Sequence, residues 1–166
     1  MMAPVLRRTG GRRGETPTLA VRARSHEKVS GLGALLVSPR RRRLSRALAL
    51  HVKGNIRGPQ VRRFLAHLHR HFPGPVVLLW DRGQPHKHLA VREWLAAHPS
   101  WHVVWFPPYA PELNPTEQLG TYLKYGRLAN FAPDVVEEIP RAVGRELRRR
   151  PCLSASNIGH YLCSRQ

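Results

Sequence analysis

Two acidic residues follow apolar runs at positions where carboxylates could bind a metal ion. Asp81 comes directly after the run PVVLLW at 75–80, and Glu117 follows a second run, HVVWF at 102–106, after a proline-rich loop. If both runs are neighbouring strands, their carboxyl ends meet at one edge of a sheet, where ligands of open α/β sheets bind. Carboxylate oxygens suit Mg²⁺, and paired metal ions can clamp the attacking and leaving oxygens of a phosphodiester reaction. The pair therefore predicts metal-dependent phosphodiester chemistry.

Both acids also have simpler explanations. The sequence Asn114-Pro115-Thr116-Glu117 is close to an ideal helix start, with Asn as the N-cap, Pro at the first helical position and Glu at the third. A glutamate at that position can reach back to the N-cap amide. Asp81 is one of only two aspartates in the chain, but it could be a solvated loop acid after a strand. For both residues these explanations and metal binding stay open.

The apolar periodicity predicts the elements that position these acids. Even spacing of apolar residues indicates a β-hairpin, spacing of three and four residues indicates amphipathic helices, and continuous apolar runs indicate strands buried on both faces. The predicted strands are 29–37, 44–52, 75–80 and 102–106. The predicted helices are 59–72, 87–98, a segment from about Pro115, and 134–150, which Pro140 should interrupt or kink. This order predicts an α/β fold, with antiparallel strands first and parallel crossovers later.

The net charge indicates the class of partner. The chain has 166 residues, with 28 Lys+Arg against 10 Asp+Glu and a formal net charge of +18. A balance this basic is typical of proteins that bind a polyanion, and nucleic acid is the obvious candidate. Four arginines, Arg40, Arg41, Arg42 and Arg43, lie at the tip of the predicted hairpin. We expect them to contact DNA phosphates, with a solvated charge run as the alternative.

Other features of the sequence indicate the number of domains and the cellular compartment. The length corresponds to about one domain, and the chain contains no uncharged run near the roughly 18 residues that a spanning helix needs. The basic stretch at 1–15 has no apolar core, so it is not a secretory signal. Cys152 and Cys163 are too few for a disulfide framework. We expect no membrane contact and a cytoplasmic, nucleoid-associated protein.

Three segments make the sequence recognisable. They are VVLLWDRGQPH at 76–86, AVREWLAAHP at 90–99 and FPPYAPELNPTEQLGTYLK at 106–124. They resemble the bacterial insertion-sequence transposases related to the mariner superfamily, of the DDE type. The block PPY-x-PELNP-x-E is the most specific part, because its Pro, Asn and Glu residues recur at fixed offsets. The resemblance covers most of residues 4–130.

The resemblance implies a ribonuclease H-like fold, a mixed sheet flanked by helices, in which three acids bind two Mg²⁺ or Mn²⁺ ions for DNA strand cleavage and transfer. By position, Asp81 matches the second acid and Glu117 the third, with 35 residues between them. His86 matches a histidine near the family's active site, where we expect it to contact DNA; a solvated helix entrance is the alternative. The implied partners are double-stranded DNA, as transposon ends and target, and a second copy of the chain in a homodimer.

This sequence departs from the family pattern at the first of the three metal-binding acids. In these transposases that acid ends a strand upstream of the segment that matches 1–17, and no acid precedes Glu15 here. We therefore expect a ribonuclease H-like domain at 29–150 that lacks its first strand, with an irregular basic segment at 1–28 and a tail at 151–166. We expect the catalytic-domain part of a DDE transposase, inactive alone. The alternatives are a non-catalytic DNA-binding remnant that could pair with an intact transposase, and an incompletely folded relic.

Overall fold

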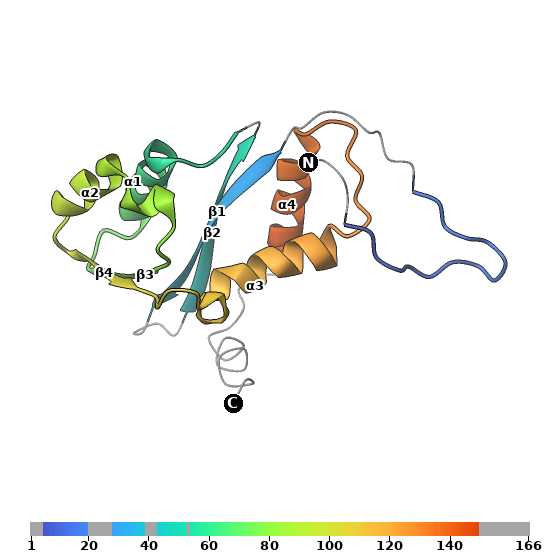
Figure 1. Ribbon diagram of the computed structural model, residues 1–166, viewed down its shortest axis with the longest axis horizontal. Coiled ribbons are helices and arrows are strands. Elements are labelled where there is room, and N and C mark those ends of the chain that lie inside the picture. Colours follow the sequence, from blue (N-terminus) through green and yellow to red (C-terminus); the bar gives the residue numbers. More distant parts are fainter. Residues whose placement is uncertain (1–4, 20–27, 39–42, 53, 150–166) are drawn as a thin grey trace.

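The structure is a computed structural model, which describes residues 5–19, 28–38, 43–52 and 54–149; of 43–46 and 148–149 it describes only the backbone. The predicted tail at 151–166 lies outside the described residues. A long β-hairpin crosses the middle of the molecule (Figure 1), with a lobe of two helices and two short strands on one side and further helices on the other. No helix among the described residues is long and apolar enough to cross a membrane.

The hairpin consists of β1 (Val29–Ser38) and β2 (Arg43–Val52), which pair antiparallel over their whole length. This confirms the hairpin that the even apolar spacing predicted. Successive side chains of a strand point to opposite faces. The β1 residues that pack against the lobe are Leu32, Ala34 and Leu36. Gly31 and Gly33 line a cavity on the other side, so the hairpin separates two layers.

The lobe joins two strands through a helical crossover. Its helices are α1 (Gly58–His71) and α2 (Leu89–Ala96), and its strands are β3 (Val76–Trp80) and β4 (Trp101–Trp105). A short 3-10 helix, η1 (Gln84–Lys87), precedes α2. The two strands pair in parallel, as a crossover through a helix requires. The parallel crossover predicted from the order of elements is confirmed.

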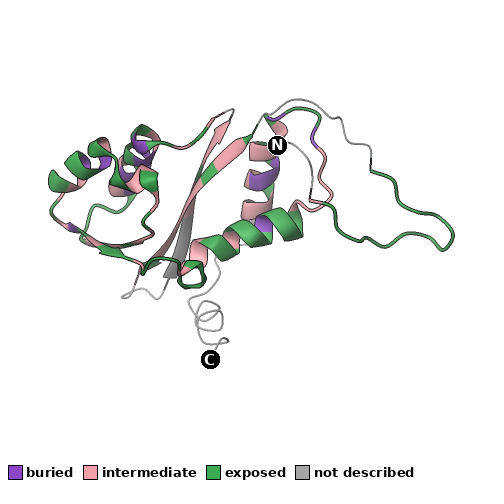
Figure 2. Cartoon of the chain, viewed as in Figure 1, coloured by how far each residue is buried: buried purple, intermediate pink, exposed green. Residues whose placement is uncertain are grey.

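The core of the lobe is built on α1 and α2 (Figure 2), where the buried residues gather. The cluster consists of Val61, Phe64, Leu65, Leu68, Val91, Trp94 and Trp101. The α1 members recur every three or four residues, which is the period that predicted this helix. Val61 and Leu65 are almost completely buried, and burying such a side chain contributes about 1.5–3 kcal/mol.

The prediction that β3 and β4 are buried on both faces is wrong. Val76, Leu78 and Trp80 pack against the core cluster, but Val77 and Leu79 are 65% and 56% exposed. On β4, Val104 is likewise half exposed. Helices cover only one face of this sheet within the described residues. A continuous apolar run does not reveal whether a second layer exists, because that depends on segments distant in the sequence.

The four strands form two separate sheets instead of one mixed sheet. In the part of the chain that the structure describes, β1 pairs only with β2 and β3 only with β4. Both sheets nevertheless share one helical layer, because residues of β1 and of β3 pack against the same core cluster. One edge of β1 and one edge of β3 consequently have no strand partner among the described residues.

The helix predicted from about Pro115 is confirmed. A short 3-10 helix, η2 (Pro111–Leu113), leads into α3 (Pro115–Thr121), which continues as a π-helix, η3 (Tyr122–Arg127). The N-cap is Asn114, whose Oδ1 accepts a hydrogen bond from the Thr116 amide at 3.1 Å. The local helix-start signal therefore fixes where this segment begins.

The last described helix, α4 (Glu138–Arg149), starts later than the predicted 134–150. Pro140 lies in its first turn, where the missing N–H costs no helical hydrogen bond. The predicted interruption at this proline is therefore wrong. An ion pair of 2.7 Å between Arg127 Nε and Glu146 Oε2 joins α4 to η3.

Two glycines with opposite surroundings test this packing. A Cβ on Gly120, within α3, would meet nothing within 4 Å, so Gly120→Ala should raise the free energy of unfolding by about 0.5–1 kcal/mol, because alanine loses less backbone entropy. A Cβ on Gly58, at the start of α1, would overlap His88. Gly58→Ala should therefore lower the free energy of unfolding by about 1–3 kcal/mol. Urea unfolding measures both; a neutral Gly58→Ala would contradict the contact between α1 and His88.

Candidate active site

Asp81 lies at the carboxyl end of β3, and neighbouring groups hold its carboxylate. Oδ1 of Asp81 accepts a hydrogen bond from the Gly83 amide at 2.9 Å and lies 3.2 Å from Nε2 of His86. The side chain is 46% exposed. Asp81 is therefore an oriented carboxylate that solvent reaches, and its place in the loop after β3 is compatible both with metal binding and with the alternative of a solvated loop acid.

His86, in η1, is packed against β3. Its side chain is 11% exposed, and its ring centroid lies 4.1 Å from that of Trp80. Burial lowers the pKa of His86, and the charge of Asp81 opposes this shift. Nε2 of His86 faces Asp81 and Nδ1 is buried, and the contact of His86 with DNA stays a prediction.

Glu117 lies in the first turn of α3, but it does not complete a capping box. The amide of Asn114 donates to the carbonyl of Pro111 at 3.0 Å, and no hydrogen bond joins it to the Glu117 carboxylate in the described structure. The Glu117 side chain is exposed. The N-cap function belongs to Asn114, so the Glu117 carboxylate is available for another role.

The structure brings the two acids together. Asp81 and Glu117 both line one cavity of about 220 Å³, together with Arg82, Asn114 and the loop 106–111. The parallel pairing is the cause, because Phe106, just after β4, donates its amide to the Trp80 carbonyl at 2.7 Å. The chain then turns through the proline-rich loop and returns to the same sheet edge with Glu117.

Sequence reasoning missed one residue of this cavity, Tyr109. It is fully exposed at the loop, and its φ of 58° lies in the left-handed region. Residues other than glycine adopt this region rarely, and such strain gathers at functional sites. The signal in the sequence was its position within PPY-x-PELNP, between prolines that restrict the backbone.

The carboxylates of Asp81 and Glu117 are suitable ligands for one hard divalent cation. Oδ2 of Asp81 and both oxygens of Glu117 make no hydrogen bond or ion pair within the described residues. Mg²⁺ characteristically uses one or two carboxylates and keeps several waters. No group of three or more His, Cys, Asp or Glu side chains that could hold a metal ion occurs in the described ranges. The arrangement therefore suits one hydrated ion better than a paired clamp.

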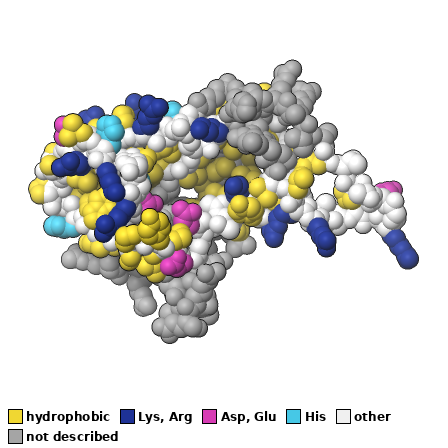
Figure 3. Space-filling view, viewed as in Figure 1, with side chains coloured by type: hydrophobic (Ala, Val, Ile, Leu, Met, Phe, Trp, Pro, Cys, Tyr) yellow, Lys and Arg dark blue, Asp and Glu magenta, His cyan; other side chains and the backbone are white. Residues whose placement is uncertain are grey.

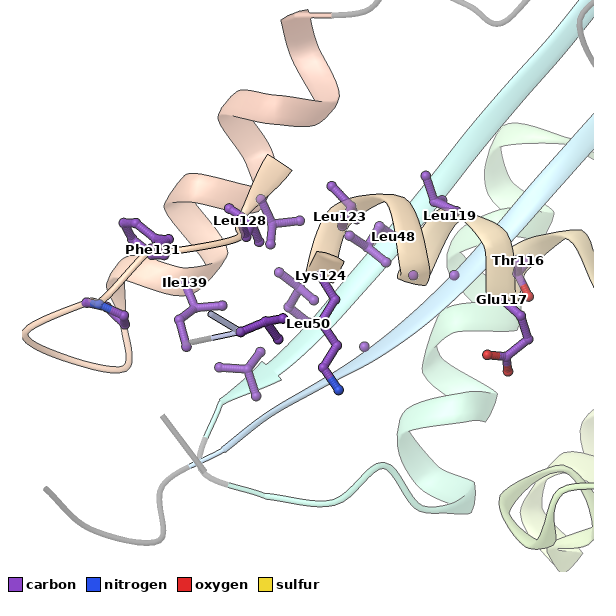
Figure 4. Close-up of a pocket in the computed structure, with 17 residues that line it drawn as sticks. Leu48, Leu50, Thr116, Glu117, Leu119, Leu123, Lys124, Leu128, Phe131 and Ile139 are labelled. Atoms are coloured by element: carbon purple, nitrogen blue, oxygen red, sulfur yellow. The ribbon is translucent and has the colours of Figure 1, made fainter. Parts of the chain in front are cut away.

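A second, larger cavity of about 480 Å³ lies between the hairpin and the helices α3, η3 and α4. Figure 4 shows its mainly apolar lining, with Leu48 and Leu50 from β2 opposite Leu119 and Leu123. Glu117 and Thr116 lie at one end of it. Apart from Glu117 and Thr116, the mainly apolar lining offers no metal ligands. The cavity lies between the layer of the hairpin and the layer of these helices.

The predicted phosphate contacts fall mostly beyond the described structure. Arg40, Arg41 and Arg42 lie outside the described residues, and of Arg43, the first residue of β2, only the backbone is described. In the face shown in Figure 3, acidic side chains gather near the centre, and Lys and Arg side chains lie around them. This face therefore carries basic side chains around a group of acidic ones.

Comparison with known protein families identifies the family of this chain. The sequence matches the family described as DDE superfamily endonuclease over residues 2–138. No match is found among curated proteins.

Solved structures that match include the Mos1 transposase paired-end complex with left transposon end, with a TM-score of 0.61 and 18% identity over 89% of this chain and 44% of that chain. The Mos1 mariner paired end complex with Mn matches with a TM-score of 0.62 and 16% identity over 96% and 47%. The chain spans less than half the length of these relatives, and the likeness shows a shared fold, which is ribonuclease H-like.

Proposed function

The chain belongs to the DDE superfamily endonucleases, and we propose that it is the catalytic-domain part of a transposase, with Asp81 and Glu117 as two of its metal-binding acids. The observation that supports this role is the cavity that both Asp81, just after β3, and Glu117, in the first turn of α3, line. The proposed reaction is hydrolysis and strand transfer at DNA phosphodiesters.

The proposed cofactor is Mg²⁺ or Mn²⁺, held by Asp81 and Glu117. When bound, such an ion activates a water or 3′ hydroxyl and stabilises the leaving oxygen. The residues of this chain supply two negative charges at one sheet edge, and the loop 106–111 lines the cavity beside them. A related structure is described as containing Mn, which supports the same class of ion here.

The proposed partner is double-stranded DNA. The net charge of +18 favours a polyanion, and one related structure is a complex with a transposon end. Both relatives are paired-end complexes, so we include a homodimer of this chain in the proposal. The proposed place of action is the nucleoid, in the cytoplasm.

A second candidate is a non-catalytic DNA-binding remnant that pairs with an intact transposase. It is favoured by one observation: a third carboxylate beside Asp81 and Glu117 is lacking among the described residues. Plasmid nicking by a chain extended at its amino terminus with a strand that ends in Asp distinguishes the two functions, because the catalytic-domain part gains nicking on this extension and the remnant does not, although both bind DNA.

The metal-binding role has a direct test. Asp81→Asn and Glu117→Gln should each weaken Mn²⁺ binding by about tenfold or more, since loss of a supporting outer-shell group alone costs about 10–100-fold. Isothermal titration calorimetry measures the dissociation constants. Glu112→Gln is the matched control, because Glu112 is an exposed acid of η2 that does not line the cavity. If the control weakens binding as much as Glu117→Gln, the assignment of Glu117 is wrong.

A further inference from the structure

The two oxygens of Asp81 are in different environments. Oδ1 faces two donors, the Gly83 amide at 2.9 Å and Nε2 of His86 at 3.2 Å. No hydrogen bond or ion pair reaches Oδ2 within the described part of the chain. The two donors therefore fix the rotation of the carboxyl group and leave one oxygen for another ligand.

The second donor is held rigidly by aromatic packing. His86 lies with its ring centroid 4.1 Å from that of Trp80, and Trp80 stacks on Trp105 of the adjacent strand with an interplanar angle of 6°. The amide of His86 donates to the Gly83 carbonyl at 3.0 Å. Ring and backbone are thus both fixed relative to the strand that carries Asp81.

The buried nitrogen of His86 indicates which tautomer is present. Nδ1 is buried and has no hydrogen-bond partner. A hydrogen on Nδ1 would be an unpaired buried donor, so the proton belongs on Nε2, where it is donated to Asp81. This neutral ring orients the carboxylate without cancelling its negative charge, as a lysine or arginine would.

Gly83 makes this close arrangement possible. A Cβ at residue 83 would lie 2.9 Å from Oδ1 of Asp81 and 3.2 Å from Cδ2 of His86. The φ of Gly83 is −55°, which any residue adopts, so space and not backbone freedom requires glycine here. The three residues form one unit, in which a side chain at residue 83 would separate the other two.

We propose that His86 is a positioning residue for Asp81: its Nε2–H holds Oδ1 and so leaves Oδ2 as the oxygen that binds the cation. This inference rests on the proposed function, because it assigns the cation to Asp81. It replaces the predicted DNA contact of His86 with a contact inside the protein. The histidine of DRGQPH acts through the aspartate five residues before it.

Mn²⁺ affinity of the whole chain tests the proposal. His86→Phe keeps an aromatic ring against Trp80 but removes the donor, and it should weaken Mn²⁺ binding by about tenfold, the lower end of typical outer-shell effects. His86→Gln keeps an N–H donor and should restore most of the affinity. His71→Phe, at an exposed histidine at the end of α1, is the matched control and should bind as the unchanged chain does.

The outcomes separate this proposal from the proposed function. If Asp81→Asn weakens binding but His86→Phe does not, the positioning role is wrong and the metal site stands. If Asp81→Asn has no effect, the proposed metal site itself fails. In the Asp81→Asn background, His86→Phe should cause no further loss; an additional tenfold loss there would show that His86 does not act through Asp81.

A second measurement does not depend on whether the variants fold. In the unchanged chain, the ¹⁵N chemical shifts of the His86 imidazole should identify the tautomer protonated at Nε2. A neutral ring with its only hydrogen on Nδ1 would overturn the proposal, because it could not donate to Asp81 through Nε2.

Discussion

Joining a strand that ends in Asp to the amino terminus of this chain should produce Mg²⁺-dependent nicking of plasmid DNA, whereas the 166-residue chain should not nick. The two carboxylates of the cavity suit one hydrated ion. A paired clamp on the attacking and leaving oxygens needs an additional ligand to bridge two ions. Family resemblance implies that a third acid at a strand end supplies it.

The added strand could pair with an edge of one of the two sheets. One edge of β1 and one edge of β3 have no strand partner among the described residues, although both strands pack on the same core cluster. Unpaired edges promote aggregation, so the extended chain should also be more soluble. Plasmid nicking and the soluble fraction, measured on both chains, test the two effects.

Two controls make the nicking result specific. The extended chain with Ala in place of its new Asp should pair its strand but not nick, and the extended chain carrying Asp81→Asn should not nick either. Robust nicking by the 166-residue chain, abolished by Asp81→Ala, would refute the requirement for a third acid.

Replacing Arg40 to Arg43 together by Ala should reduce the slope of log K against log salt for DNA binding by about 3–4, at roughly 0.9 per neutralised phosphate. Arg40, Arg41 and Arg42 lie in the sequence between Ser38, the last residue of β1, and Arg43, the first residue of β2. Affinity measured by fluorescence anisotropy from low to physiological salt gives the slope. Circular dichroism of the variant establishes that the hairpin and helices remain.

A single-residue comparison controls for net charge. Arg42→Ala should reduce the slope by about 0.9, as expected for one phosphate contact. Arg127→Ala removes the same charge but should leave the slope unchanged, because the Arg127 guanidinium is paired with Glu146 at 2.7 Å. Equal reductions in both variants would show that total charge, and not the hairpin tip, governs binding.

Most helices and strands of this chain, and their order, follow from the amino-acid sequence alone. The hairpin, α1 and the parallel strands of the lobe follow from apolar spacing, which is a property of neighbouring residues. The sequence also placed Asp81 and Glu117 at the ends of elements that meet at one edge. The shared cavity of Asp81 and Glu117 was predictable because the carboxyl ends of paired parallel strands meet at one sheet edge.

Contacts between distant segments distinguish the alternatives that the sequence left open. The capping explanation for Glu117 fails because the Pro111 carbonyl already accepts the Asn114 amide. The contact between His86 and Asp81 depends on a tryptophan beneath the ring and on the absence of a Cβ at residue 83. The exposed face of β3 and the division into two sheets depend on which distant segments cover a strand. Local periodicity encodes a strand, but its layers and edges are set by packing between segments far apart in the chain.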